Sequence, residues 1–223
     1  MIRFDIITIF PNLFDGFLNE SLLAKAQKKK LLKIEIHNLR DFTADKHKKV
    51  DDKLFGGGLG MVMKVEPIYR AVQALKKSPA SLKLRRTSKT ILFTPRGKKF
   101  TQKMAYEFSK FDQLIFICGR YEGVDERVAK NIADYKISIG DYVLMGGEIP
   151  AMAVIEIVSR LIPGVIGKPE FLKERSIRKA FVEYPQYTRP EMFKDWKVPK
   201  VLLSGDHKKI EEWRKKHGKV IEK

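Results

Sequence analysis

Three short apolar runs, each followed by a glycine-containing loop, dominate the hydrophobic and polar pattern in the middle of the chain. They span residues 90–93, 114–118 and 135–139. Apolar runs of this length that stop at a turn are typical of buried strands. Glycines at strand ends let a ligand approach the backbone, and ligands of open α/β sheets bind at such ends. The pattern therefore predicts three strands whose following loops form one small-molecule pocket.

The other apolar positions predict an α/β arrangement of further strands and helices. Strands are expected over residues 2–10 and 31–37. Helices are expected from Pro11 to the lysine run at 28–30, over residues 67–75, from Val124 onward, and over residues 148–162.

Residues 40–63 have no clear period and form a long irregular segment. Segments of this length in compact domains are usually functional or disordered. Charged residues here lead into Gly-Gly-Gly-Leu-Gly at 56–60. The glycine run follows no convincing strand, so a dinucleotide-binding fingerprint is not indicated. The pattern alone leaves both a flexible hinge and a ligand-binding loop open.

The last quarter of the chain has a different composition. We expect a first domain over residues 1–164, an interdomain linker over 165–178 and a small basic domain over 179–223. The linker is charged and lacks a strong apolar period. In the small domain, Trp196 and Trp213 are expected to anchor a limited core.

The charge balance indicates an anionic partner. The 223 residues carry a formal net charge of +18, which is large for this length. Residues 67–106 contain eleven lysines or arginines and no acidic residue. This stretch is either a solvated lysine-rich surface or a face that contacts phosphates. Charge alone does not separate RNA from DNA or membrane lipid.

Cysteine usage and hydropathy favour a cytoplasmic protein. Cys118 is the only cysteine, which excludes an internal disulfide and a cysteine metal cluster. No apolar run approaches the ~18 residues of a membrane-spanning helix. The N-terminal residues are typical of a first strand and not of a signal peptide.

Several motifs, in one order along the chain, resemble a known family. They include Gly-Arg-Tyr-Glu-Gly at 119–123, Ser-Ile-Gly-Asp-Tyr-Val-Leu at 138–144, Gly-Gly-Glu-Ile-Pro-Ala-Met at 146–152 and Tyr-Pro-Gln-Tyr-Thr-Arg-Pro at 184–190. Asp-Phe-Thr at 41–43 and the stretch 51–61 match as well. The chain thereby resembles the bacterial tRNA (guanine-N1)-methyltransferases of the knotted SPOUT superfamily.

The resemblance implies a fold, a reaction and an assembly. The fold is a mostly parallel sheet flanked by helices with a C-terminal trefoil knot, plus a small, mainly helical, tRNA-binding domain. The reaction transfers the methyl group of S-adenosylmethionine to N1 of guanosine 37, just 3′ of the anticodon. The partners are tRNA and a second copy of the chain in a homodimer, and neither DNA nor a membrane is expected.

The resemblance also implies binding residues. The target guanosine would be held by His47, Asp51 and Gly58, and tRNA would be attracted by Lys46, Lys48 and Lys49. Arg96 and Met145 depart from the commonest family pattern. The cofactor residues carried over are Leu92, Phe93, Thr94, Pro95, Gly97, Gly119, Tyr121, Glu122, Gly123, Ser138, Ile139, Gly140, Tyr142, Leu144, Gly146, Gly147 and Pro150. Without the family, core packing with a hydrogen-bonded hydroxyl is the favoured interpretation of Tyr121 and Tyr142.

Methylation of guanine N1 requires a general base and a positive group near the guanine oxygen. The resemblance implies that Arg160 is the positive group, although a cation at a helix C-terminus is common for structural reasons. The family's aspartate base falls at Arg175 by ungapped counting, and arginine is not a base at neutral pH. Glu174 is the base we expect, and a solvated linker charge is its other interpretation.

Two other functions stay open from the sequence. A tRNA-binding protein that kept the cofactor pocket but lost its base is one. The same fold acting on another RNA base or ribose is the other, which the target-guanosine segment at 41–61 disfavours. Some members of the family need a divalent cation, but no ligand cluster in the sequence places a metal.

Overall fold

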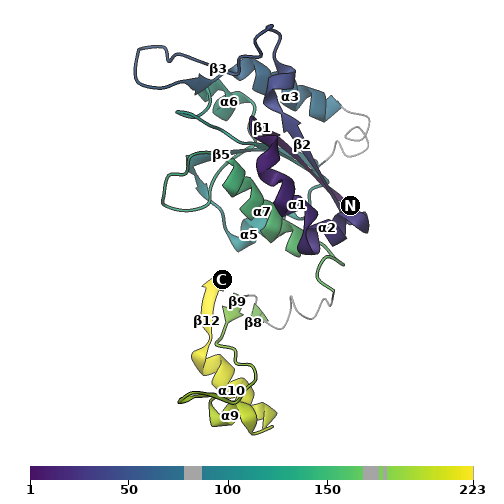
Figure 1. Ribbon diagram of the computed structural model, residues 1–223, viewed down its shortest axis with the longest axis vertical. Helices are drawn as coiled ribbons and strands as arrows, with labels where there is room; N and C mark the ends of the chain where they lie inside the picture. Colours follow the sequence, from purple (N-terminus) through teal and green to yellow (C-terminus); the bar gives the residue numbers. More distant parts are fainter. Residues whose placement is uncertain (78–86, 168–175, 178–179, 223) are drawn as a thin grey trace. The chain divides into compact units, whose positions relative to one another are not determined.

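The structure, a computed structural model, describes residues 1–77, 87–167, 176–177 and 180–222 (Figure 1). The chain divides into two compact units, residues 1–167 and residues 168–223, so the division lies within the predicted linker. Among the described residues, no helix combines the length and the apolar character that crossing a membrane requires.

A five-stranded sheet in the order β2-β1-β6-β5-β7 forms the centre of the first unit (Figure 1). Every neighbouring pair runs parallel, which confirms the predicted α/β class with a mostly parallel sheet. The carboxyl ends of the strands therefore meet at one edge. The strands are β1 (Ile2–Thr8), β2 (Leu32–Asn38), β5 (Ser88–Lys99), β6 (Gln113–Ile117) and β7 (Tyr135–Ser138).

Helices cover both faces of this sheet. One face packs against α1 (Asp15–Asn19), α2 (Ser21–Lys28), α5 (Gln102–Phe108) and α7 (Glu148–Arg160). The other face packs against α3 (Val65–Lys77) and α6 (Glu126–Asn131). Side chains alternate along each strand, so Phe4 and Phe116 enter the first core and Ile7 and Ile115 the second. Burial on both faces explains why the strands are short apolar runs.

The first predicted helix is divided in the structure. The chain forms a 3-10 turn η1 (Pro11–Phe14), then α1, then α2. Glu20 is extended, with φ −122° and ψ 167°, and Ser21 has a φ of 57°. These dihedrals interrupt the helical hydrogen bonds, so the expectation of one continuous helix from Pro11 was wrong. Helix α5 was not predicted; Thr101 caps it by accepting a hydrogen bond from the Met104 amide at 3.3 Å.

Strand β5 continues beyond the apolar run at 90–93 and includes the residues that were expected to be a loop. It pairs with β7 through residues 91–93 and again through Lys98 and Lys99, with a bulge between. Gly97 lies where the two backbones nearly touch, since a Cβ there would be 2.5 Å from the Ile137 amide nitrogen. The glycine is therefore required by the close approach of β5 and β7.

A buried polar network lies on β1, β2 and β6. The Arg3 guanidinium donates to both carboxylate oxygens of Asp5, at 2.7 and 2.8 Å, and Gln113 donates to Asp5 at 2.7 Å. Burial alone would raise the pKa of Asp5, but hydrogen bonds from His37, Arg3 and Gln113 hold it below its ordinary value. Asp5, Glu35 and His37 could together ligate a metal ion. However, Arg3 already binds both carboxylates, so a cation would have to displace it.

The segment before α3 forms a 3-10 turn η2 (Leu39–Phe42) and a small antiparallel pair, β3 (Asp51–Asp52) with β4 (Val62–Met63).

The second unit contains short strands as well as helices. Strand β9 (Ala180–Glu183) pairs antiparallel with β8 (Ser176–Ile177) and β12 (Lys219–Glu222). Strands β10 (Met192–Phe193) and β11 (Trp196–Lys197) form a hairpin. Two helices follow, α9 (Lys200–Leu203) and α10 (His207–His217). These strands were not anticipated from the sequence.

The two tryptophans of this unit behave differently. Trp213 is partly buried, stacks on His217 at a ring distance of 4.3 Å and meets Tyr187 edge-on. Trp196 is 70% exposed at the hairpin and contacts the exposed Phe193. The prediction that both anchor the core is therefore wrong for Trp196, because its ring is largely exposed on the hairpin.

Candidate functional site

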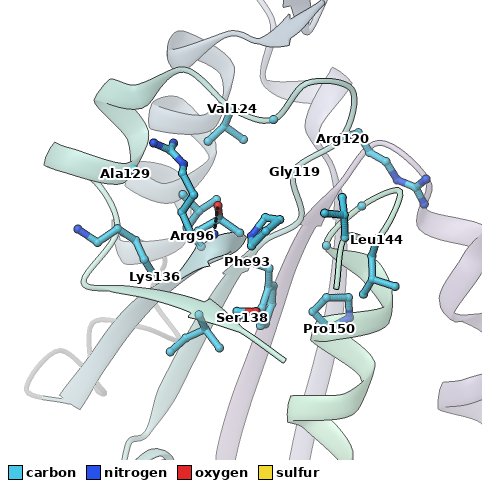
Figure 2. Close-up of a pocket in the computed structure, with 18 of the residues that line it drawn as sticks. Phe93, Arg96, Gly119, Arg120, Val124, Ala129, Lys136, Ser138, Leu144 and Pro150 are labelled. Atoms are coloured by element: carbon cyan, nitrogen blue, oxygen red, sulfur yellow. Dashed lines mark hydrogen bonds between the residues drawn. The ribbon is translucent and has the colours of Figure 1, made fainter. Parts of the chain in front are cut away.

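A cavity of about 520 Å³ lies at the carboxyl ends of β5, β6 and β7. Figure 2 shows Phe93 of β5, Ser138 of β7 and Pro150 of α7 around it. Its volume is within the range of small-molecule and cofactor sites. The pocket is therefore where the sequence pattern expected it, beyond three strand ends.

Glycines bring the loops of this pocket into direct backbone contact. The Gly147 amide donates to the Gly119 carbonyl at 2.9 Å. A Cβ on Gly147 would lie 2.6 Å from the Cα of Cys118, so no other residue fits there without backbone movement. Cys118 itself is fully buried, and burial followed by the charge of Glu148 raises the pKa of its thiol well above the ordinary value. Such a thiol is a packing group and not a nucleophile.

Fifteen of the seventeen residues proposed for the cofactor line this cavity. Gly97 and Gly140 do not line it. A Cβ on Gly97 would meet the backbone of β7, and a Cβ on Gly140 would meet the side chain of Tyr142. Gly140 packs against the ring of Tyr142, whose hydroxyl donates to the Ile139 carbonyl at 3.3 Å. The lining residues in the proposed set are Leu92, Phe93, Thr94, Pro95, Gly119, Tyr121, Glu122, Gly123, Ser138, Ile139, Tyr142, Leu144, Gly146, Gly147 and Pro150.

Sequence reasoning missed nine other lining residues: Arg96, Arg120, Val124, Glu126, Ala129, Lys136, Ile137, Val143 and Met145. Most are immediate neighbours of proposed residues, and the signal that could have found them is loop continuity. Several are charged. Arg96 donates to Glu126 at 2.6 Å, and this hydrogen bond holds the pKa of Glu126 below its ordinary value. Figure 2 shows Arg96 and Lys136 on one side of the cavity and Arg120 on the other.

The proposed guanosine residues lie outside the lining of this cavity. His47 is exposed and donates its amide to Asp45 at 3.0 Å. Asp51 is in β3 opposite Met63, and Gly58 is exposed with a φ of +128°. The structure of one chain therefore does not bring the three together with the cofactor residues.

Main-chain hydrogen bonds nevertheless attach this segment to the pocket. Glu122 donates to the Met61 carbonyl at 3.0 Å, Met63 donates to Gly123 at 2.9 Å, and Asp125 donates to Met63 at 2.9 Å. The glycine loop between β3 and β4, which precedes these attachments, holds Phe55 and Leu59 almost completely exposed, at 101% and 93%.

Comparison with known proteins identifies the family. The profile of tRNA (Guanine-1)-methyltransferase TrmD matches residues 2–221. The chain belongs to this family. It is 56% identical over 216 residues to a tRNA (guanine-N(1)-)-methyltransferase of Dictyoglomus turgidum, which covers 97% of this chain and 84% of the relative. A counterpart in Carboxydothermus hydrogenoformans is 53% identical, over 96% of this chain and 81% of the relative.

A solved structure supports the same assignment. The tRNA (m1G37) methyltransferase of Aquifex aeolicus aligns with a TM-score of 0.78 and 41% identity, over 97% of this chain and 88% of that chain. The resemblance to the tRNA (guanine-N1)-methyltransferases and their SPOUT fold is thereby confirmed, and the chain is an enzyme of this class. Membership of TrmD implies S-adenosylmethionine as methyl donor.

Of the two predicted catalytic residues of this TrmD member, the structure describes only Arg160. Arg160 is the last residue of α7, where it is exposed. Glu174 and the adjacent Arg175 lie outside the described residues.

Proposed function

We propose that this chain transfers the methyl group of S-adenosylmethionine to N1 of guanosine 37 in tRNA. The observation that carries the proposal is the cavity at the ends of β5, β6 and β7, lined by fifteen residues of the proposed cofactor set. Membership of the family supports the reaction, and the name of the Aquifex relative supports position 37. A binding protein without catalysis is not favoured, because the curated relatives carry the enzyme's name over nearly the whole chain.

The residues present fit the methyl donor. Glycines such as Gly123, where an added Cβ would meet no atom within 4 Å, leave main-chain groups accessible. The apolar wall comes from Leu92, Phe93 and Pro150. Glu122 supplies a carboxylate that suits a cationic ligand, whereas the carboxylate of Glu126 is paired with Arg96. Aromatic and aliphatic walls with a few polar groups are typical of cofactor pockets. When bound there, S-adenosylmethionine would supply an electrophilic methyl group.

The chain's own residues would then activate the guanine. The Glu174 carboxylate would accept the N1 proton as N1 takes up the methyl group, and the electrons of the bond between methyl carbon and sulfur would remain on sulfur. The products are N1-methylguanosine and S-adenosylhomocysteine. The Arg160 guanidinium offsets negative charge that develops on the guanine oxygen. His47, Asp51 and Gly58 would hold the guanine, with Lys46, Lys48 and Lys49 near the tRNA phosphates.

The second unit has surface features that suit RNA. A groove of about 570 Å³ contains the aromatic rings of Tyr184, Tyr187 and Trp213 together with Arg189 and Arg214. Residues 183–220 hold ten lysines and arginines against six acidic residues. Aromatic rings stack on unpaired bases, and arginine binds phosphates. These features support the proposal that the second unit contacts tRNA.

Exposed apolar side chains beside the pocket support a homodimer. Val143 and Met145 are 82% and 88% exposed on the pocket loop, and Ile149 is 58% exposed at the start of α7. Apolar side chains clustered at a surface mark interaction sites. We propose a dimer in which a second copy covers them, and place the enzyme in the cytoplasm. The proposal includes a divalent cation as a possible cofactor, without assigning residues to bind it.

The test is methyl transfer from labelled S-adenosylmethionine to two tRNA transcripts that differ only in guanosine or adenosine at position 37. We expect label on the guanosine transcript alone. Equal labelling of both transcripts would refute the target, and cofactor binding without label on either would refute catalysis. Sedimentation of the same preparation tests the dimer.

A further inference from the structure

A buried carboxylate lies behind the wall of the cofactor pocket. Glu148, in the first turn of α7, is 1% exposed and is not among the residues that line the cavity. One of its oxygens accepts the Thr8 hydroxyl at 2.7 Å, and the other accepts Arg120 Nε at 2.8 Å. Burying a carboxylate is expensive unless it is paired and hydrogen-bonded. Glu148 therefore depends on both partners being in place.

Arg120 connects this carboxylate to three other segments. Its backbone amide donates to the Met63 sulfur at 3.0 Å, and its guanidinium lies over the ring of Phe10 at 4.8 Å. A terminal nitrogen reaches the Met145 carbonyl at 3.5 Å. A Cβ added to Gly146 would collide with the guanidinium, so the arginine packs directly on the backbone of the pocket loop.

Thr8 fixes the opposite side of the carboxylate. Its oxygen accepts the Phe10 amide at 3.0 Å, which directs its own proton to Glu148. Thr8 is fully buried at the end of β1, in the rigid sheet. The connection from sheet to pocket thus runs Thr8, Glu148, Arg120 and then the loop at 145–147.

We propose that Glu148 is a positioning residue for the methyl donor, with Thr8 and Arg120 as its partners. The carboxylate holds Arg120, and Arg120 holds the loops at 119–123 and 145–147 in the arrangement that exposes their main-chain groups to the ligand. The inference rests on the proposed function in that it assumes S-adenosylmethionine binds in this cavity. Glu148 touches neither the cofactor nor the guanine, so its effect is on cofactor affinity and not on the chemical step.

The experiment compares Glu148→Gln with the wild-type chain by calorimetric titration with S-adenosylmethionine. Glutamine keeps the shape but loses the charge, and its amide NH2 replaces one acceptor oxygen, so one of the two hydrogen bonds is lost and the other is weakened. We expect the dissociation constant to rise about tenfold or more. In steady-state assays KM for S-adenosylmethionine should rise similarly, while kcat changes less than about threefold.

Asp5→Asn is the matched control. It removes a carboxylate just as buried from the same strand as Thr8, with charged partners of its own. Asp5 does not line the cavity. We expect both variants to have a lower unfolding temperature than the wild type, but only Glu148→Gln should bind the cofactor more weakly.

A second pair keeps the test informative if Glu148→Gln folds poorly. Thr8→Val removes the hydroxyl at nearly constant shape, and Thr8→Ser retains it. We expect weaker cofactor binding in the valine variant and recovery of most of the affinity in the serine variant.

The outcomes separate the two proposals. If the wild-type chain does not bind S-adenosylmethionine, the proposed function fails. If the wild type binds but Glu148→Gln and Thr8→Val bind equally well, only the positioning role fails. Equal weakening by Asp5→Asn and Glu148→Gln would also overturn it, because general destabilisation would then explain both.

Discussion

The pocket of the first unit and the groove of the second unit have similar volumes but are built in opposite ways. The pocket, about 520 Å³, is formed by strand-end loops in which Gly119, Gly146 and Gly147 expose the backbone. The groove, about 570 Å³, is lined by long side chains such as Tyr187 and Arg189, and its aromatic rings contact one another. The pocket of the first unit therefore presents mainly backbone groups to a ligand, and we call it a main-chain site. The groove of the second unit presents mainly side chains, and we call it a side-chain site.

This difference suits two kinds of ligand. A main-chain site of this kind tolerates few substitutions, because Gly147 is set against the backbone of Cys118 and Gly146 against the side chains of Arg120 and Glu148. A small, constant cofactor fits such a site. A side-chain site of rings and cations suits a nucleic acid, whose phosphates and base faces bind through charge and stacking. The comparison predicts that substitutions in the two units will separate cofactor binding from tRNA binding.

The largest effect on activity should come from substitution of the proposed base, Glu174. We expect this residue to act in the chemical step, and not in binding either the cofactor or tRNA. Glu174→Gln removes the group that accepts the N1 proton, and general-base catalysis contributes ~10²–10⁴-fold. We expect kcat for methyl transfer to fall within that range while cofactor and tRNA affinities hold. Single-turnover assays at saturating substrates measure this.

The neighbouring acid Glu170 provides the control for the proposed base. Glu170→Gln removes one negative charge from the same part of the chain. Its kcat should stay close to wild type. Full activity in Glu174→Gln would show that another group takes the proton.

Gly147→Ala tests the main-chain character of the pocket. The new methyl group would lie 2.6 Å from the Cα of Cys118 and 3.1 Å from the Gly119 nitrogen, so the α7 loop must move. We expect the free energy of unfolding to fall by about 1–3 kcal/mol, the usual size of an overpacking effect. Cofactor affinity should fall with it. Urea unfolding and calorimetric titration measure the two effects.

Gly16→Ala is the matched glycine substitution. Gly16 is in α1, and an added Cβ there meets no atom within 4 Å. Alanine favours helix by up to about 1 kcal/mol, so stability should be unchanged or slightly higher. A Gly147→Ala chain that bound cofactor normally would contradict the backbone account of the pocket.

Arg189→Ala tests the side-chain character of the groove. It removes one cation from the lining, so KM for tRNA should rise several-fold while the dissociation constant for S-adenosylmethionine stays constant. The slope of log affinity against log salt should become shallower by about one, as expected for one lost phosphate contact.

Lys208→Ala is the control for charge alone. Lys208 is exposed on α10 and does not line the groove. If it weakened tRNA binding as much as Arg189→Ala, the groove would have no special role and diffuse charge would explain the binding.

The two units also differ in how far the sequence predicted them. Strands β1, β2, β6 and β7 were located to within one or two residues, and the apolar runs of β6 and β7 end just before glycine-containing loops. The short pair β3 and β4 was not predicted. The main error was in β5, where local pattern could not show that residues 94–97 bulge out and the strand then rejoins β7. That rejoining depends on a close backbone contact at Gly97, which is a tertiary feature.

The second unit was less predictable for a related reason. Tryptophan is a large apolar residue, so the sequence favours a place in the core for Trp196. In the structure it lies on a two-residue strand of a hairpin and is exposed. The cofactor set came from motif resemblance, and side chains such as Arg120 were missed because their role arises from contact with Glu148, 28 residues away. The trefoil knot and the homodimer stay predictions of the resemblance.

The stability of the two units should also depend differently on pH, and this difference is the smallest effect that we expect. The first unit buries Asp5, whose pKa is lowered in the folded state. The pKa values of Asp206 and Glu211 in the second unit are lowered too, but these side chains are 39% and 66% exposed, so solvent screens their interactions. A lowered folded-state pKa gives stability that is present above the unfolded value of about 4 and is lost as pH falls through the folded value. The protection factors of the β1 and β6 amides in hydrogen exchange, which are corrected for the pH dependence of the intrinsic exchange rate, should therefore fall on acidification.

Asp5→Asn determines whether this one carboxylate is responsible. Asparagine cannot ionise, so the variant should be less stable than wild type at neutral pH, and the gap should narrow as pH falls below about 4. Urea unfolding of both chains across this range measures the gap. A gap independent of pH would mean that Asp5 contributes only shape and hydrogen bonding. Because α10 bears its ion pairs at the surface, its exchange should be nearly the same in both chains.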